Sequence, residues 1–250
     1  MAQYGNRIDH RHYTDWLQKP SAQRLLALEA GWLGDWLAQL DGEQLLYAGV
    51  DPAPRFLRHS PMSHVFTTAL PWQSAEQVAA MRMNPDAWPL MDQSLDLVVL
   101  QHTLDMSRRP HQLVREASRC LVSSGYLIIV GFNPWSFWGA QRWLRTFSSE
   151  LPWLSNTVSA GRLCDWLTLL DFRIESVQNI AHLWPIKAFN EGLSRRIDRV
   201  LMGRRWLPGN AYLLVARKTI AGVTRIRTRR WRVADNGFTI PAPAGCSPLP

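Results

Sequence analysis

Apolar residues along this chain follow two patterns, those of amphipathic helices and those of buried strands. From Ser21 to Leu40, leucines and tryptophans recur every three or four residues, which predicts a helix with one buried face. Continuous apolar runs at Gln44–Val50 and Leu95–Gln101 predict strands of a parallel sheet, because strands covered on both faces carry no polar side. The same patterns predict strands at Ser63–Thr68, Tyr126–Phe132, Phe172–Val177 and Ala211–Ala216, helices at Arg109–Val122 and Ser159–Leu170, and a short helix or the start of a third strand at Ser74–Ala79.

Strands that alternate with helices, without an internal repeat, predict an α/β fold with a doubly wound, mostly parallel seven-stranded sheet. We expect one domain over residues 21–219, with residues 1–20 as an N-terminal extension and residues 184–209 as an insertion before the last strand. Ligands of such sheets bind beyond the carboxyl ends of the strands, where the strand order reverses. Candidate functional residues are therefore sought at strand ends.

The net charge of +8 is unevenly distributed. Residues 217–250 hold seven Arg or Lys and one acid, so they carry +6 of it. High charge with few apolar residues predicts that residues 220–250 form a basic, Pro-rich, disordered tail. Arginines around Trp231 suit phosphate contact and base stacking, so nucleic acid is a candidate partner of residues 217–232. A solvated extension without a partner is the alternative.

Targeting signals and metal-binding patterns are not recognisable in the sequence. The first residues lack the apolar core of a secretory signal, and no apolar run approaches the roughly 20 residues that span a bilayer. We therefore expect a cytoplasmic protein without a membrane span. The cysteines Cys120, Cys164 and Cys246 are too few and too scattered for a disulfide framework or a zinc site, and the histidines show no metal-ligand spacing, so no metal is expected.

The most specific signal lies between Trp88 and Pro134. It consists of Trp88-Pro89-Leu90, then Leu95-Asp96 in a buried strand, then Arg-Glu-Ala-Ser-Arg-Cys-Leu at residues 115–121, and then a glycine turn at Gly125 before the next strand. This succession resembles the second half of class I S-adenosylmethionine-dependent methyltransferases, in particular those of quinone biosynthesis. The resemblance implies a Rossmann-like fold, S-adenosylmethionine as cofactor and a small-molecule methyl acceptor.

The resemblance also implies that the first strand and its turn hold the methionine part of the cofactor. The family usually has an acid-x-Gly-x-Gly-x-Gly run there, because only glycine lets the backbone approach the ligand closely. In this chain Gly49 stands at the first glycine position. Tyr47 replaces the acid, and Asp51 and Ala53 replace the later glycines. Gly49 and Asp51 are thus the candidate contacts to the methionine part, although Asp51 would attract its ammonium group and repel its carboxylate.

Further site residues follow from the same resemblance. Asn84 occupies the place of the acid that accepts from the adenine amine, and Asp86 lies two residues further on. No acid follows the second strand, where the family binds the ribose hydroxyls. Gln101 and His102 line the cofactor after the fourth strand, and His102 is the candidate catalytic general base for a hydroxyl or amine acceptor. The alternative is that His102 bonds neighbouring backbone and orients its loop.

Aromatic residues follow the fifth strand. Asn133, Trp135, Phe137 and Trp138 are predicted to form one wall of the acceptor pocket, and their character favours a flat or apolar acceptor. The leading hypothesis is an S-adenosylmethionine-dependent methyltransferase. The alternative is a non-catalytic binding or scaffold protein that keeps the methyltransferase fold and contacts nucleic acid through its basic tail, because the cofactor turn keeps one glycine of the family's three.

Overall fold

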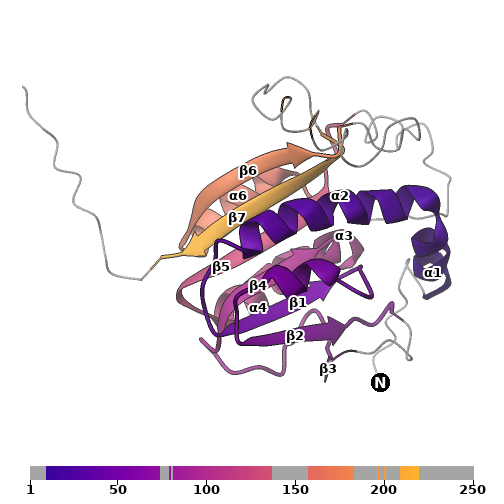
Figure 1. Cartoon of the computed structure of the whole chain (residues 1–250). Coiled ribbons are helices and arrows are strands. Elements are labelled where there is room, and N and C mark those ends of the chain that lie inside the picture. The colour runs from indigo at the N-terminus through magenta and orange to yellow at the C-terminus, as the bar shows by residue number, and fades with distance from the viewer. Residues whose placement is uncertain are drawn as a thin grey trace, which may run out of the picture.

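The computed structural model describes residues 10–73, 79, 81–136, 157–182, 196, 200 and 209–219 (Figure 1). Within these residues seven strands form one sheet in the order β3-β2-β1-β4-β5-β7-β6. Strand β7 is antiparallel to β5 and β6, and the other neighbours are parallel. This confirms the predicted doubly wound, mostly parallel sheet. The strands are β1 (Gln44–Gly49), β2 (His64–Ala69), β3 (Met81–Arg82), β4 (Leu95–Gln101), β5 (Leu121–Phe132), β6 (Phe172–Ile180) and β7 (Ala211–Lys218).

Helices cover both faces of the sheet (Figure 1). One face packs against α1 (His10–Gln18) and α2 (Pro20–Leu37), and the other against α4 (Pro110–Cys120) and α6 (Ala160–Leu169). The short α3 (Thr103–Met106) follows β4, and a 3-10 helix, η1 (Arg55–His59), follows the β1 turn. The described part of the chain contains no helix that is long and apolar enough to cross a membrane.

The continuous apolar runs of the central strands supply core residues to both faces of the sheet. In β1, Leu45 and Tyr47 join the core under α1 and α2, whereas Leu46 and Ala48 join the core under α4 and α6. Because successive strand residues point to opposite sides, a strand covered on both faces needs apolar residues at every position. The predicted central strands are confirmed on this basis.

The motif between Trp88 and Leu121 acts as a structural connection between α4 and the segment before β4. Arg119 donates hydrogen bonds to the main-chain oxygens of Trp88 (3.0 Å) and Leu90 (2.9 Å). Glu116 accepts from the main-chain nitrogen of Trp88 (3.0 Å) and pairs with Arg119 (2.9 Å). The Arg-Glu-x-x-Arg pattern and the preceding Trp-Pro-Leu step are therefore parts of one contact.

The predicted glycine turn before the fifth strand is not a separate turn. Helix α4 ends at Cys120, β5 begins at Leu121, and Gly125 lies within β5. Pairing with β4 moves from Leu121 directly to Tyr126, so the residues between them form a bulge. A Cβ on Gly125 would lie 3.0 Å from two main-chain oxygens. A residue without a side chain is therefore needed here, because the backbone segments approach each other closely.

Packed structure begins earlier than the expected boundary at residue 21. Helix α1 lies within the segment expected to be an extension, and its Tyr13 and Trp16 are buried in the core under α2. The expected insertion at 184–209 and the tail at 220–250 fall almost entirely outside the described residues, as do residues 74–78 of the element expected before β3.

The first two charges of the basic segment belong to the fold. Arg217 and Lys218 lie in β7, where Arg217 donates to the main-chain oxygen of Ser124 (3.2 Å). The Lys218 ammonium group donates to the main-chain oxygens of Ser118 (2.7 Å) and Leu121 (2.9 Å) at the end of α4. These two side chains thus contact the domain, and the nucleic-acid contact expected of residues 217–232 stays a prediction.

Candidate functional site

The turns after β1 and β4 lie side by side where the strand order reverses. Gly49 is the register partner of Gln101, and the main-chain nitrogen of Val50 donates to the oxygen of Gln101 (3.1 Å). In doubly wound sheets, ligands bind in the crevice beyond this point. The structure thus brings together four predicted site residues, namely Gly49, Asp51, Gln101 and His102.

Tyr47 fills the space beside Gly49. A Cβ on Gly49 would come closer than 3.0 Å to the Tyr47 hydroxyl, so the glycine makes room for this hydroxyl. The hydroxyl accepts from the main-chain nitrogen of Asp51 (3.0 Å) and donates to Oε1 of Gln101 (2.7 Å). Burial, followed by the charge of Asp51, raises the pKa of Tyr47 well above its ordinary value, so the phenol keeps the proton that it donates.

The main-chain oxygens of the same turn are also bonded within the chain. The Gly49 oxygen accepts from Nε2 of Gln73 (2.7 Å), and the Val50 oxygen accepts from the Tyr13 hydroxyl (2.7 Å). Gln73 also donates to Tyr13 (3.2 Å), so α1 and the segment after β2 close this turn together. We did not predict Tyr13 or Gln73 from the sequence, because neither lies in a recognisable motif.

Asp51 contributes mainly to the shape of the turn. Its Oδ1 accepts from the main-chain nitrogen of Ala53 (2.9 Å), a local bond typical of aspartate in turns. The side chain is half-buried, and burial raises the pKa of its carboxyl group. Its predicted contact to a cofactor ammonium group stays a prediction.

Glu29 of α2 connects the two turns. Its Oε2 accepts from Nε2 of Gln101 (2.6 Å), and its Oε1 pairs with Nε2 of His102 (2.8 Å). On the other side of the imidazole ring, Nδ1 of His102 pairs with Oδ2 of Asp105 (2.9 Å). All four side chains are fully buried. Burial by itself lowers the pKa of His102, but the two carboxylates outweigh it and raise this pKa to about 10.

The raised pKa favours the imidazolium form of His102 at neutral pH, in which both ring nitrogens donate. It lies in the left-handed region (φ 54°) and packs on Phe132, with ring centroids 4.1 Å apart. Asp105 also accepts from the main-chain nitrogen of Phe132 (3.0 Å), which ties the β4–α3 turn to the end of β5. The His102 ring bonds two side-chain carboxylates, whereas the alternative expected bonds to neighbouring backbone. The role of His102 as general base stays a prediction.

The sequence does contain a signal for Glu29. It lies four residues after Leu25 and four before Leu33, on the buried face of α2. An acid on an apolar helix face needs a partner, because an unpaired buried charge is strongly unfavourable. The identity of that partner, His102, is not visible in the sequence.

The residues expected near the adenine lie in one turn after β3. Asn84 is half-buried, and its Oδ1 accepts from the main-chain nitrogen of Asp86 (3.0 Å). The main-chain nitrogen of Ala87 donates to the oxygen of Asn84 (3.2 Å) and closes this turn. The adenine contacts of Asn84 and Asp86 stay predictions.

The residues expected to line the acceptor pocket are only partly described. Nδ2 of Asn133 donates to the main-chain oxygen of Gly209 (3.0 Å), and its Oδ1 accepts from the nitrogen of Trp135 (3.0 Å). The side chain of Trp135 is 79% exposed, so it does not pack into the domain. Phe137 and Trp138 lie outside the described residues. The predicted aromatic wall therefore stays a prediction.

Comparisons with known proteins agree with this fold. Residues 28–129 match the family model described as Methyltransferase domain. The uncharacterized protein YafS of Escherichia coli (strain K12) is 32% identical over 142 residues, which are 57% of this chain and 58% of YafS. The chain thus spans less than two thirds of the length of this curated relative.

Solved structures of S-adenosylmethionine-dependent methyltransferases share the fold at low identity. One from Thermotoga maritima has a TM-score of 0.58 at 17% identity, covering 84% of this chain and 96% of that one. Another, from Archaeoglobus fulgidus, has a TM-score of 0.53 at 15% identity, covering 77% and 94%. The strand order and the paired turns at the carboxyl edge are those of the class I S-adenosylmethionine-dependent methyltransferase fold, and residues 28–129 match the methyltransferase domain family.

Proposed function

We propose that this protein binds S-adenosylmethionine at the carboxyl edge of β1, β2 and β4 and transfers its methyl group to a small, flat or apolar acceptor. The observation that carries the proposal is the methyltransferase family match over residues 28–129, a span that contains both turns of the crevice. The aromatic residues after β5 and the resemblance to quinone-biosynthesis enzymes support the character of the acceptor. The comparisons do not favour the non-catalytic alternative.

The residues of the turn after β1 can hold the cofactor if the Tyr47 hydroxyl moves away. Gly49 leaves room for one polar group beside the main-chain nitrogen of Asp51, and the Tyr47 hydroxyl takes that room in this structure. With this hydroxyl moved, the Gly49–Asp51 turn would hold the methionine end. The turn after Gln101 would line the reactive end, and Asn84 would accept from the adenine amine. The bound cofactor would supply an electrophilic methyl group.

The chain's own contribution would be positioning and exclusion of water. Methyl transfer depends on in-line placement of the reacting groups, and fixed placement can supply a large part of a rate enhancement. The ion pairs of His102 with Glu29 and Asp105 fix the turn after β4. Tyr13 and Trp16 of α1 pack beside the same turns and keep their surroundings apolar.

Calorimetric titration of the full chain with S-adenosylmethionine and S-adenosylhomocysteine tests the proposal. We expect both to bind, and we expect Gly49→Val to abolish binding because its side chain would enter the space beside the turn. Gly161→Val in α6 is the matched control, since a Cβ there meets nothing within 4 Å. Failure of the wild-type chain and of the Tyr47→Phe variant to bind either compound would overturn the proposal.

The nucleic-acid contact expected of residues 217–232 stays a separate prediction. Apart from residues 217–219 it falls outside the described residues. Its test is the salt dependence of nucleic-acid affinity, which should be steep if the basic tail releases counterions and should vanish in a chain cut after Thr219.

A further inference from the structure

Two buried tyrosines lie against glycines of the sheet, on opposite faces. Tyr47 lies against Gly49 under α2, and Tyr212 of β7 lies against Gly131 of β5 under α4 and α6. In both pairs a Cβ on the glycine would come closer than 3.0 Å to the tyrosine hydroxyl. The hydroxyls differ in their bonding. That of Tyr47 has hydrogen-bond partners, whereas that of Tyr212 is buried without one.

The Tyr47 hydroxyl lies at the edge of the sheet where doubly wound folds bind their ligands. It accepts from the main-chain nitrogen of Asp51, which follows β1 at the reversal of strand order. Main-chain N–H groups in turns of this kind bind the anionic groups of ligands. The phenol oxygen thus takes a hydrogen bond that a ligand carboxylate would otherwise accept.

A chain of buried hydrogen bonds holds this hydroxyl in place. The hydroxyl donates to Oε1 of Gln101, and Nε2 of Gln101 donates to Oε2 of Glu29. The second oxygen of Glu29 pairs with His102. Gln101 thus uses its acceptor on Tyr47 and a donor on Glu29, so its orientation is set by both partners. The position of the Tyr47 hydroxyl therefore depends on an acid of α2.

We infer that the Tyr47 hydroxyl is a built-in occupant of the β1 turn, positioned by Glu29 through Gln101, and that a ligand carboxylate reaches the Asp51 nitrogen only by displacing it. The ligand class is a nucleoside that carries an amino-acid carboxylate, so the inference rests on the proposed function. A carboxylate forms a stronger, charge-assisted bond with an N–H group than a phenol does, which favours the exchange. The bonds that must first be broken lower the apparent affinity, because only the fraction of molecules with an open turn can bind.

Titration of the full-length chain with S-adenosylhomocysteine tests the displacement. Tyr47→Phe removes the competing hydroxyl and leaves the ring, so we expect the affinity to rise roughly tenfold, the equivalent of one hydrogen bond of about 1.4 kcal/mol. Tyr212→Phe is the matched control, because its hydroxyl has no partner to lose, and its affinity should equal that of wild type. Unchanged or weaker binding by Tyr47→Phe would overturn the inference, because it would mean that the hydroxyl does not compete or that it contacts the ligand itself.

A double-mutant cycle tests the positioning role of Glu29. Glu29→Gln removes the charged acceptor of Gln101, so affinity should rise several-fold in the wild-type background and stay unchanged in the Tyr47→Phe background. A purely structural role would change affinity equally in both backgrounds and would overturn this part of the inference. Gln101→Leu serves as the second variant if Glu29→Gln does not fold, because it cuts the same connection and leaves the ion pair of Glu29 with His102.

The outcomes separate this inference from the proposed function. If neither wild type nor Tyr47→Phe binds S-adenosylhomocysteine, the proposed function fails and the inference fails with it. If wild type binds and Tyr47→Phe binds no more tightly, the inference alone fails. Binding detected only in Tyr47→Phe would support both.

Discussion

In both tyrosine–glycine pairs the hydroxyl lies close to where a Cβ of the glycine would stand, but only one of the two hydroxyls is hydrogen-bonded. Tyr47 beside Gly49 is connected to Gln101, Glu29 and the main chain of the β1 turn. Tyr212 beside Gly131 buries its hydroxyl without a hydrogen bond, and burial followed by the charge of Asp105 raises the pKa of its phenol well above the ordinary value. A glycine at a strand end thus marks room for a neighbour, and the polar groups around it decide whether a ligand can compete for that room.

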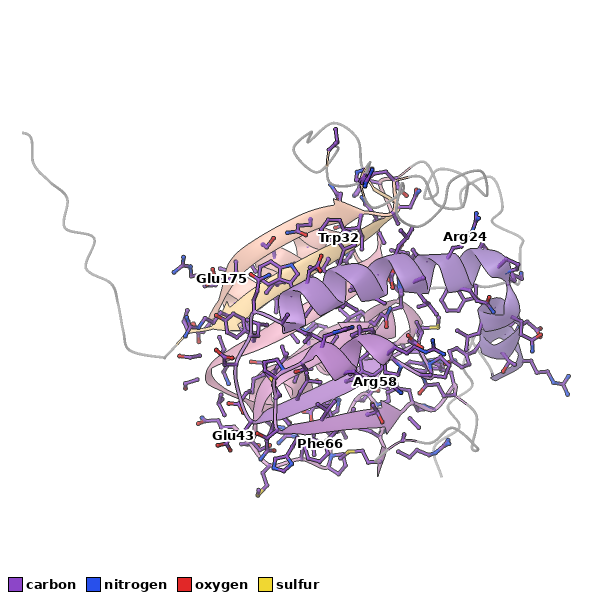
Figure 2. All side chains as sticks on the ribbon, viewed as in Figure 1. Arg24, Trp32, Glu43, Arg58, Phe66 and Glu175 are labelled. Carbon is purple, nitrogen blue, oxygen red and sulfur yellow. The ribbon has the colours of Figure 1, made fainter. Side chains whose placement is uncertain are left out.

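The largest expected loss of stability follows from removing Glu29, which is connected through Gln101 to Tyr47 but not to Tyr212. Glu29→Ala leaves the buried Nε2 atoms of His102 and Gln101 without a partner, so the free energy of unfolding should fall by about 3–5 kcal/mol. Urea unfolding followed by circular dichroism measures it. The control is Glu175→Ala on β6 (Figure 2). The ion pair of Glu175 with Arg173 is partly exposed and should contribute less than about 1 kcal/mol. Equal losses in the two variants would contradict this interpretation of the Glu29 network.

A loss of stability should also accompany a rise in pH. The folded state holds the pKa of His102 at about 10, above its ordinary value of 6.5. The stabilisation is therefore complete below pH 6.5 and is lost progressively up to about pH 10. Unfolding free energies at pH 6.5, 8 and 9.5 should decrease in wild type. In His102→Gln, which lacks the titrating group, the decrease should be reduced, and an equal slope in both proteins would exclude His102 as its source.

Replacing each of the two glycines by alanine should destabilise the protein by different amounts. Gly131→Ala crowds the Tyr212 hydroxyl, which has no hydrogen bonds to lose, and should lower the free energy of unfolding by about 1–2 kcal/mol. Gly49→Ala must also displace the hydrogen bonds of Tyr47, so its cost should reach about 3 kcal/mol. Urea unfolding measures both, with Gly161→Ala as the unhindered control. A larger cost at Gly131 than at Gly49 would reverse the comparison.

Removing the two hydroxyls should give the smallest effects, with different signs. Tyr47→Phe leaves the Asp51 nitrogen and Gln101 short of a partner and should destabilise by about 1–2 kcal/mol. Tyr212→Phe removes a buried, unpaired hydroxyl, so its stability should be unchanged or raised by up to about 1 kcal/mol. Thermal unfolding of the two variants side by side measures the difference. Destabilisation by Tyr212→Phe would indicate a partner for its hydroxyl.

The sheet was predictable because its signals are local. The runs around Leu46 and Val98 predict buried strands regardless of what covers them, and the helix after Pro110 follows from its own periodicity. The bulge at Gly125 was misjudged as a turn, because a bulge and a turn both use glycine and differ only in the partner strand. The role of α1 was missed because His10–Gln18 is a short, polar-rich segment whose buried residues are few.

The order of the helices and strands along the chain, the resemblance to methyltransferases and the placement of Gly49, Gln101 and His102 at strand ends follow from the sequence alone. Only the tertiary structure decided what those positions do. The contacts at these positions join residues that are far apart in the sequence. Glu29 lies 72 positions before Gln101 and 73 positions before His102, and Tyr13 lies 60 positions before Gln73. Such contacts leave no periodic pattern in the sequence, because a buried polar side chain finds its partner only after the surrounding helices and strands have packed.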